Sequence, residues 1–141
     1  MKRILAFDVG EKRIGIAVSD ALGITAQGVE TYTLTGDDEK DFAHFAELAK
    51  KYAPVKLLFG LPKNMDGTEG FQAQSVREFA KQLTDLTGCE YDFYDERLTS
   101  VSAHQALSDG NISRKKHKGV VDKIAAVLIL QGYMASHGGI L

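Results

Sequence analysis

The stretch Ile4-Leu5-Ala6-Phe7-Asp8-Val9-Gly10 places a single carboxylate inside an apolar run. Such a run, preceded by two basic residues and closed by a glycine, predicts a short buried strand. Because burial of an unpartnered carboxylate is costly, Asp8 requires backbone hydrogen bonds, a cation or a metal ion beside it. Gly10 predicts a sharp turn, and residues 13–20 (RIGIAVSD) predict a return strand that pairs with the first.

The composition predicts one domain over residues 1–141 and limits the kinds of partner. The chain has 17 Lys and Arg against 19 Asp and Glu, so it lacks the strongly basic balance of a typical nucleic-acid binder. Its one cysteine, Cys89, excludes an internal disulfide and fits a reducing compartment. The four histidines are scattered, so any metal ion would be held by oxygen. The N-terminal apolar run is too short for a signal peptide and no segment could span a bilayer, so we expect a cytosolic protein.

The rest of the chain predicts strands and helices in alternation. Helices before and after the strand at 55–60 imply parallel pairing. The loop that follows this strand, LPKNMDGTEG (61–70), lies where open α/β sheets usually bind ligands. We expect a third strand at 24–34, antiparallel to the second, a helix from 37 or 38 to 52, strands at 55–60 and 91–94, helices at 71–86, from 99 or 100 to 107 and at 119–136, and a mobile surface loop at 109–119.

Three acidic residues stand where a strand ends or a buried helix begins: Asp8, Glu96 and Asp122. Two strand ends and one helix start can converge on one point, where their oxygens would bind a hard divalent ion. Two such ions, Mg²⁺ or Mn²⁺, would activate water and stabilise the leaving oxygen of a phosphodiester. Each acid also has a plainer interpretation. Asp122 would pair with the helix dipole of its first turn, and Glu96 would form a salt bridge with Arg97 or a nearby lysine.

A basic run precedes Asp122 and predicts contact with phosphates. It consists of Arg114, Lys115, Lys116 and Lys118, and phosphate binding through such residues weakens steeply with salt. The alternative is a solvated loop. Arg13 and Arg97, each near a candidate acid, would position phosphate or simply pair with that acid. His117, in the same run, is a bystander in the simplest interpretation.

Four segments together resemble the signature segments of the YqgF family of Holliday junction resolvases, which have an RNase H-like fold. The resemblance spans nearly the whole chain, and the segments come in the family's order. They are DVGEKRIGIAVSD (8–20), GLPKNMDGTEG (60–70), DERLTS (95–100) and VDKIAAVLILQGY (121–133).

This resemblance implies a five-stranded mixed sheet, three antiparallel strands followed by two parallel ones, flanked by helices. It also implies a metal-dependent nuclease whose acids fall on Asp8, Glu96 and Asp122, the residues chosen above on physical grounds. Members of the family have been linked to Holliday junction resolution and to maturation of the 5′ end of 16S ribosomal RNA precursors.

We therefore expect an endonuclease acting on structured nucleic acid, precursor ribosomal RNA in preference to a DNA junction, with ribosomal particles as candidate partners. A symmetric junction would favour a dimer able to cut two strands, so a strictly monomeric protein would argue for the RNA role. We expect a monomer or weak homodimer. Two alternatives stay open. One is a non-catalytic nucleic-acid-binding module, and the other is a nucleotide-binding phosphotransferase, suggested by Asp8-Val9-Gly10 but normally built from two such domains.

Overall fold

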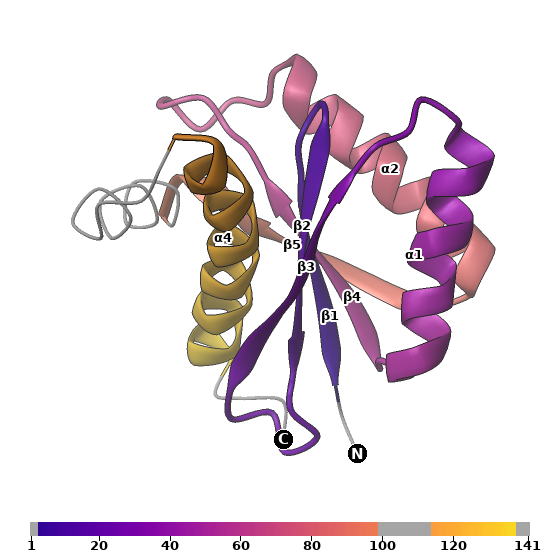
Figure 1. Ribbon diagram of the computed structural model, residues 1–141. Coiled ribbons are helices and arrows are strands. Elements are labelled where there is room, and N and C mark those ends of the chain that lie inside the picture. Colours follow the sequence, from indigo (N-terminus) through magenta and orange to yellow (C-terminus); the bar gives the residue numbers. More distant parts are fainter. Residues whose placement is uncertain (1–2, 99–113, 138–141) are drawn as a thin grey trace.

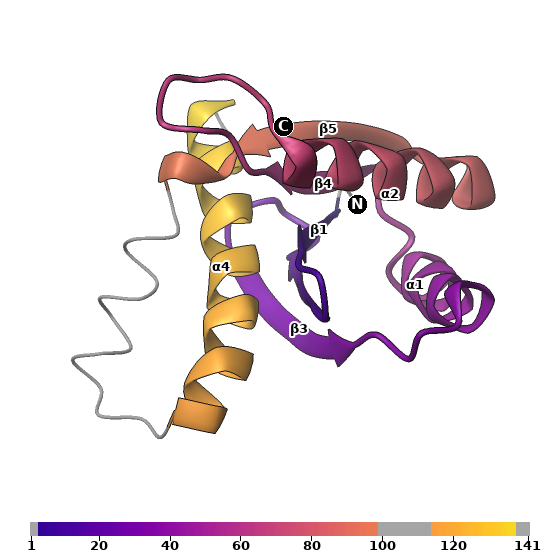
Figure 2. The ribbon, with the colours of Figure 1, turned by 90° about the horizontal axis from the view of Figure 1, so that it is seen from above.

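The computed structural model describes residues 3–98 and 114–137. Its centre is a five-stranded sheet in the order β3-β2-β1-β4-β5. Strands β1, β2 and β3 pair antiparallel, whereas β1 with β4 and β4 with β5 pair parallel. Helix α4 covers one face, and α1 and α2 cover the other (Figures 1 and 2). The bounds are β1 Ile4–Val9, β2 Arg13–Ser19, β3 Ala26–Thr33, α1 Asp38–Tyr52, β4 Lys56–Leu61, α2 Phe71–Thr87, β5 Glu90–Asp95, the 3₁₀ turn η1 Glu96–Leu98 and α4 Arg114–Ser136.

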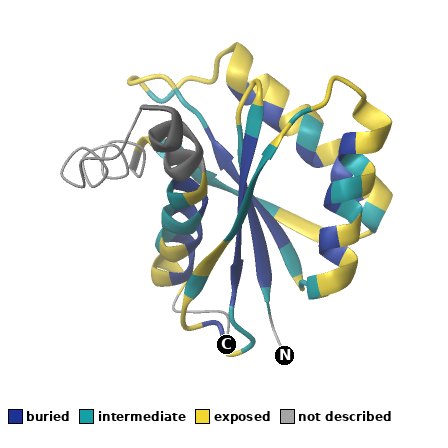
Figure 3. Ribbon diagram, viewed as in Figure 1, coloured by how far each residue is buried: buried dark blue, intermediate teal, exposed yellow. Residues whose placement is uncertain are grey.

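Alternation along β1 divides the core into two layers, because successive side chains of a strand point to opposite faces. Leu5 and Phe7 belong to the layer under α1 and α2, where the Phe7 ring stacks on Phe59 at 5.4 Å between centroids. Ile4 and Ala6 belong to the layer under α4. Figure 3 shows the resulting buried centre of the sheet. Asp8 continues the second series, so the strand alternation assigns it to the α4 face.

The predicted helix ends of α1 and α2 are confirmed. The Asp37 side chain caps α1 by accepting a hydrogen bond from the backbone N–H of Lys40 at 3.3 Å. Ala53 ends α1 in the left-handed conformation, with φ of 46°. Gly88 ends α2 in the same region, with φ of 73°, where glycine carries no Cβ penalty.

The predicted loop at 109–119 is wrong for its second half. Helix α4 begins at Arg114, so the basic run is helical and the helix starts before the predicted Gly119. The run lacks apolar periodicity, but Arg and Lys are good helix formers. Apolar spacing reports only a helix face that packs on the core. Its absence in these first turns therefore did not exclude a helix. Residues 109–113 and the helix predicted to end near 107 lie outside the described residues.

The remaining predicted elements are confirmed with boundary shifts of one or two residues. The third strand is antiparallel to the second, and the strand at 56–61 pairs in parallel with both of its neighbours. The sheet has the three antiparallel and two parallel strands that the resemblance implied, with helices on both faces. Within the described parts of the chain, no helix has the length and apolar character needed to cross a membrane.

Candidate active site

Asp8 lies near the carboxyl end of β1, at the centre of the sheet. It is paired in register with Gly15 of β2, and Gly60 of β4 follows the Phe59 that pairs with Phe7. The turn after β1 is tight, because the backbone N–H of Gly10 donates to the carbonyl of Arg13 at 3.0 Å. The sheet thus presents one carboxylate between two glycines, where neighbouring side chains leave room for a second group.

Glu96 supplies that second group. It follows β5 directly, in the turn η1. Burial raises the pKa of Glu96 to about 10, assisted by a side-chain hydrogen bond with Asp8 and then by the negative charges of Asp8 and Asp95. Two carboxylates in direct contact must share a proton or a cation, since both cannot ionise without one. The contact between Asp8 and Glu96 is therefore a site that can hold a proton or a cation.

Gly60 makes this contact sterically possible. A Cβ atom built on Gly60 would lie 2.7 Å from Cγ and 2.8 Å from Oε1 of Glu96, and 2.5 Å from Cδ1 of Ile129. Such separations are closer than carbon and oxygen atoms tolerate. The absent side chain thus leaves the space in which Glu96 crosses β4 toward Asp8. The same space receives Ile129 of α4, so β1, β4, β5 and α4 meet at this point.

Arg97 ties the end of β5 to the loop after β4. Its guanidinium Nη2 lies 2.6 Å from Oδ2 of Asp95, and its Nη1 donates to the carbonyls of Asn64 and Met65 at 3.5 and 3.4 Å. Hydrogen bonding to Arg97 lowers the pKa of the Asp95 carboxyl. The plainer interpretation of Arg97 was a pair with the candidate acid Glu96, whereas the ion pair of Arg97 in the structure is with Asp95. The residue fixes the backbone that carries Glu96.

Asp122 belongs to α4, but its side chain lies outside the described set. The prediction that it occupies the first turn of this helix is wrong, because α4 begins at Arg114. A helix dipole acts within the first turn, so the dipole interpretation of Asp122 no longer applies. Helical spacing aligns position 122 with Ala126 and Ile129, which are both fully buried under the sheet.

The six predicted phosphate contacts fall into three groups. Arg13 begins β2 and is half-buried near the end of β1 that carries Asp8. Arg97 has the contacts given above. The backbone of the basic run forms the first turns of α4, and its side chains lie outside the described set: Arg114, Lys115, Lys116 and Lys118.

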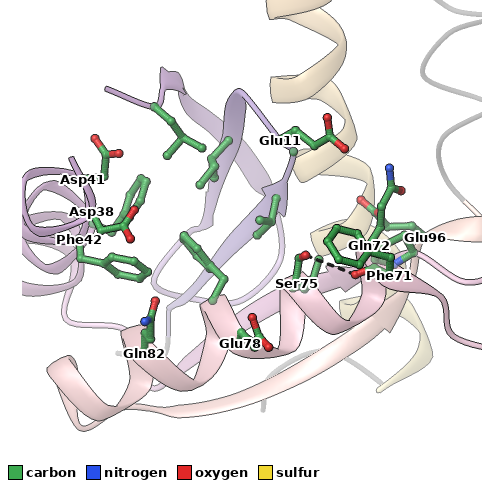
Figure 4. Close-up of a pocket in the computed structure, with 18 residues that line it drawn as sticks. Glu11, Asp38, Asp41, Phe42, Phe71, Gln72, Ser75, Glu78, Gln82 and Glu96 are labelled. Atoms are coloured by element: carbon green, nitrogen blue, oxygen red, sulfur yellow. Dashed lines mark hydrogen bonds between the residues drawn. The ribbon is translucent and has the colours of Figure 1, made fainter. Parts of the chain in front are cut away.

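A pocket of about 470 Å³ opens on the other side of the site. Figure 4 shows Glu96 at one end of it and Asp38, Asp41 and Phe42 of α1 at the other. Its wall between them is α2. The pocket joins the candidate active site to the seam between the two helices.

The donor set fits a hard divalent cation, since carboxylate oxygens are the ligands that Mg²⁺ and Mn²⁺ prefer. The described side chains bring two carboxylates together, Asp8 and Glu96. They include no cluster of three or more potential ligands of the His, Cys, Asp and Glu types. A third carboxylate would have to come from the part of α4 whose side chains are not described.

Sequence reasoning missed the parts played by Gly60 and Asp95. Both lie in the segments quoted for the family, but a close approach between a strand and a side chain 36 positions away leaves no periodic signal. A usable signal was available for Asp95, which precedes the sequence Glu96-Arg97. An acid two positions before an arginine at a strand end can hold that arginine in place.

Comparisons with known proteins show the family of the chain. The family model described as "RuvX: Holliday junction resolvase" matches residues 2–136. Relatives named "Putative pre-16S rRNA nuclease" include one from Halalkalibacterium halodurans, 50% identical over 94% of this chain and 95% of its own length. Others come from Lactococcus lactis subsp. cremoris, 46% identical over 96% and 95%, and Clostridium acetobutylicum, 46% identical over 95% and 98%.

Among solved structures, RuvC of T. thermophilus in complex with a Holliday junction substrate aligns with a TM-score of 0.60. The alignment covers 98% of this chain and 97% of RuvC at 12% identity, so it supports the fold alone. The expected fold and the expected family are both confirmed. The chain belongs to the RuvX (YqgF) family of nucleases, the Holliday junction resolvase family.

Proposed function

We propose that this protein is a metal-dependent endonuclease that processes the 5′ end of pre-16S rRNA. The observation that carries the proposal is the contact between Asp8 and Glu96, in which burial and a neighbouring carboxylate raise the pKa of Glu96. Paired carboxylates of this kind are common at catalytic sites, because such a pair seldom stabilises the fold. The choice of RNA substrate rests on the names of the close relatives.

Asp8 and Glu96 would hold one Mg²⁺ or Mn²⁺, and Asp122 of α4 would complete the site for two ions. Bound metal of this kind supplies an activated water and stabilises charge on the leaving oxygen of a phosphodiester. The chain's own contribution is positional. Asp8 is fixed by the central strand, Glu96 by the space over Gly60, and the backbone beside Glu96 by the pairing of Arg97 with Asp95.

Substrate would approach from the side of α4. We assign phosphate contacts to Arg13 and Arg97 at the sheet edge and to the basic run at the start of α4, Arg114, Lys115, Lys116 and Lys118. The first turn of a helix favours anions through the dipole, which adds to the charge of Arg114, Lys115 and Lys116. The enzyme would act in the cytoplasm on ribosomal precursor particles.

The test is cleavage of a precursor 16S 5′ segment by the wild type and by Asp8→Asn, with Mg²⁺, Mn²⁺ or a chelator. We expect metal-dependent cutting that falls at least about 1,000-fold in the variant, as when a core catalytic group is removed. Asp85→Asn, on the exposed face of α2, is the control and keeps full activity. Cutting that survives Asp8→Asn in a correctly folded protein would refute the assignment of the site.

A second candidate function is Holliday junction resolution, favoured by the description of the family. A four-way DNA junction is therefore assayed in parallel. Symmetric cutting of two strands requires two active sites, so this function predicts a dimer by analytical ultracentrifugation, whereas RNA processing is compatible with a monomer or weak homodimer. Binding of either nucleic acid with no cutting of either would point instead to a non-catalytic binding module.

A further inference from the structure

The seam between α1 and α2 is a groove that begins at Glu96 and runs away from the candidate active site. Two adjoining hollows share Asp38, Phe42 and Gln82. The first, of about 470 Å³, is the one in Figure 4 that ends at Glu96. The second, of about 810 Å³, continues outward along the two helices to Leu86, which is 58% exposed. Together they form one groove with its inner end beside the candidate active site.

The floor of the groove is apolar and its rim is acidic. Phe42 and Phe79 lie at the seam, with ring centroids 5.0 Å apart, and Leu86 extends the apolar surface outward. Among the described residues that line either hollow, none is lysine or arginine. The acidic rim residues are Glu11, Asp38, Glu39, Glu47, Glu78 and Asp85.

Local helix chemistry explains only part of this acidity. Asp38 and Glu39 lie in the first turn of α1, where the dipole favours negative charge. Glu47, Glu78 and Asp85 are not in a first turn, so the dipole gives no reason for them. Asp41 is different again, because its carboxylate accepts hydrogen bonds from Tyr32 and Thr35 and holds α1 against β3. The remaining rim acids lie around an apolar floor.

The charge pattern decides the kind of occupant. Phosphates would be repelled by the rim, so the groove is not a path for nucleic acid. A second copy of this chain offers the basic run of α4, but α4 lies on the opposite face of the sheet (Figure 2). A contact from one face to the other is head-to-tail and gives no closed dimer. A separate protein could place apolar side chains on the floor of the groove and lysine or arginine side chains beside its acidic rim.

We propose that the groove docks a Lys- and Arg-flanked amphipathic helix of a partner protein. Such a helix lays its apolar face into a groove through side chains at positions i, i+3, i+4 and i+7. The proposal goes beyond the nuclease activity and does not depend on it. The two faces of the sheet then have separate partners, a protein over α1 and α2 and nucleic acid over α4.

The test uses a fluorescein-labelled synthetic peptide of about 18 residues, five helical turns, with leucine on one face and lysine elsewhere. Binding to the full chain is followed by fluorescence anisotropy and mapped by amide chemical shifts. The matched probe keeps the leucines and replaces each lysine with glutamate. We expect the lysine peptide to bind and to shift amides of α1 and α2, and the glutamate peptide to bind at least about tenfold more weakly, a difference of 1.4 kcal/mol.

Two matched variants locate the charge effect. Glu47→Lys changes the rim of the groove, and Glu90→Lys makes the same change at an exposed position at the start of β5. We expect at least about fivefold weaker peptide binding for the first variant and an unchanged affinity for the second. The proposal would be overturned if the lysine peptide bound the two variants with equal affinity, if its amide chemical shift changes mapped away from α1 and α2, or if it did not bind. Self-association of the chain that Glu47→Lys abolishes would also overturn it, because the occupant would then be a second copy.

Discussion

At the scale of single residues, the protonation of Glu96 predicts that the stability of the folded protein depends on pH. An ordinary glutamate has a pKa near 4.5, whereas burial beside Asp8 raises the pKa of Glu96 to about 10. Between these values the folded, metal-free protein retains a proton that the unfolded chain has released. The stabilising contribution is therefore complete below about pH 4.5 and is lost as the pH rises through the folded-state pKa.

We therefore expect the melting temperature of the protein in chelator to fall between pH 5 and pH 9. Glu96→Gln, which keeps a neutral donor beside Asp8, flattens this fall, and Glu90→Gln at an exposed site leaves it unchanged. Scanning calorimetry across the pH range provides the measurement. A slope that Glu96→Gln leaves intact would mean that another group titrates.

Gly60 gives a second prediction at this scale. The methyl group of Gly60→Ala would displace Glu96. On the proposed mechanism we expect cleavage to fall by roughly 100-fold, as for a misplacement of about 1 Å in a catalytic group. Cleavage rate and thermal stability are measured together. Gly70→Ala is the control, since a Cβ there meets only the Asn64 side chain at 3.7 Å.

Adding Ile129→Val to Gly60→Ala separates the two neighbours of the new methyl group. The shorter valine relieves the contact with α4 but not the contact with Glu96. We expect stability to recover in part and cleavage to stay low. Recovery of cleavage would instead assign the loss to the packing of α4.

The residues of the candidate site differ in how far the sequence could identify them. Asp8 was recognisable because a charge inside an apolar run needs a partner. Glu96 was recognisable from its place at a strand end, but its contact with Asp8 depends on strand order, which no local pattern encodes. Gly60 was unrecognisable as a site residue, since its importance comes from two side chains distant in the sequence.

At the scale of elements, the ends of α1 and α2 make a matched pair for a stability test. Ala53 and Gly88 both end a helix in the left-handed region. A residue with a Cβ is disfavoured there by about 1–2 kcal/mol. We expect Ala53→Gly to raise the free energy of unfolding by about 0.5–1 kcal/mol and Gly88→Ala to lower it by a similar amount. Urea unfolding followed by circular dichroism measures both, and changes of the same sign would contradict the explanation.

The helices also show where periodicity succeeds and where it fails. Apolar spacing predicted α1 and α2 well, because each buries one face against the sheet. It missed the beginning of α4, because the residues from Arg114 to Lys118 provide no apolar spacing. Helix propensity was the remaining signal, and in a charged segment it is weak on its own.

At the scale of the whole molecule, the basic start of α4 predicts a salt dependence of RNA binding. Replacing Lys115 and Lys116 together with glutamine should lower the slope of log affinity against log salt by about 0.7–0.9 for each phosphate that the protein then fails to neutralise. The control replaces Lys50 and Lys51, an adjacent pair in the last turn of α1. Filter binding at several salt concentrations gives the slopes. Equal slopes in the two double variants would mean that the basic run does not contact the RNA.

The pairing directions of the strands could be predicted from sequence because the rules of strand connection are general. A hairpin, a third antiparallel strand and helices on either side of a later strand leave few arrangements of the sheet. The mixed sheet of three antiparallel and two parallel strands was implied by the resemblance to the family, and its strand order, β3-β2-β1-β4-β5, comes from the structure alone. The groove between α1 and α2 was not accessible, since it depends on how far apart two helices pack, and that distance is set by side chains in three dimensions.

The central position of β1 in the sheet also has a consequence during synthesis of the protein on the ribosome. The strand that carries Asp8 is made first, but its parallel neighbour β4, the turn with Glu96 and helix α4 leave the ribosome much later. Contacts between distant parts of a chain form only after both parts exist. A half-made chain therefore carries one carboxylate without the other, and on the proposed mechanism it leaves the RNA around it uncut until synthesis is nearly complete.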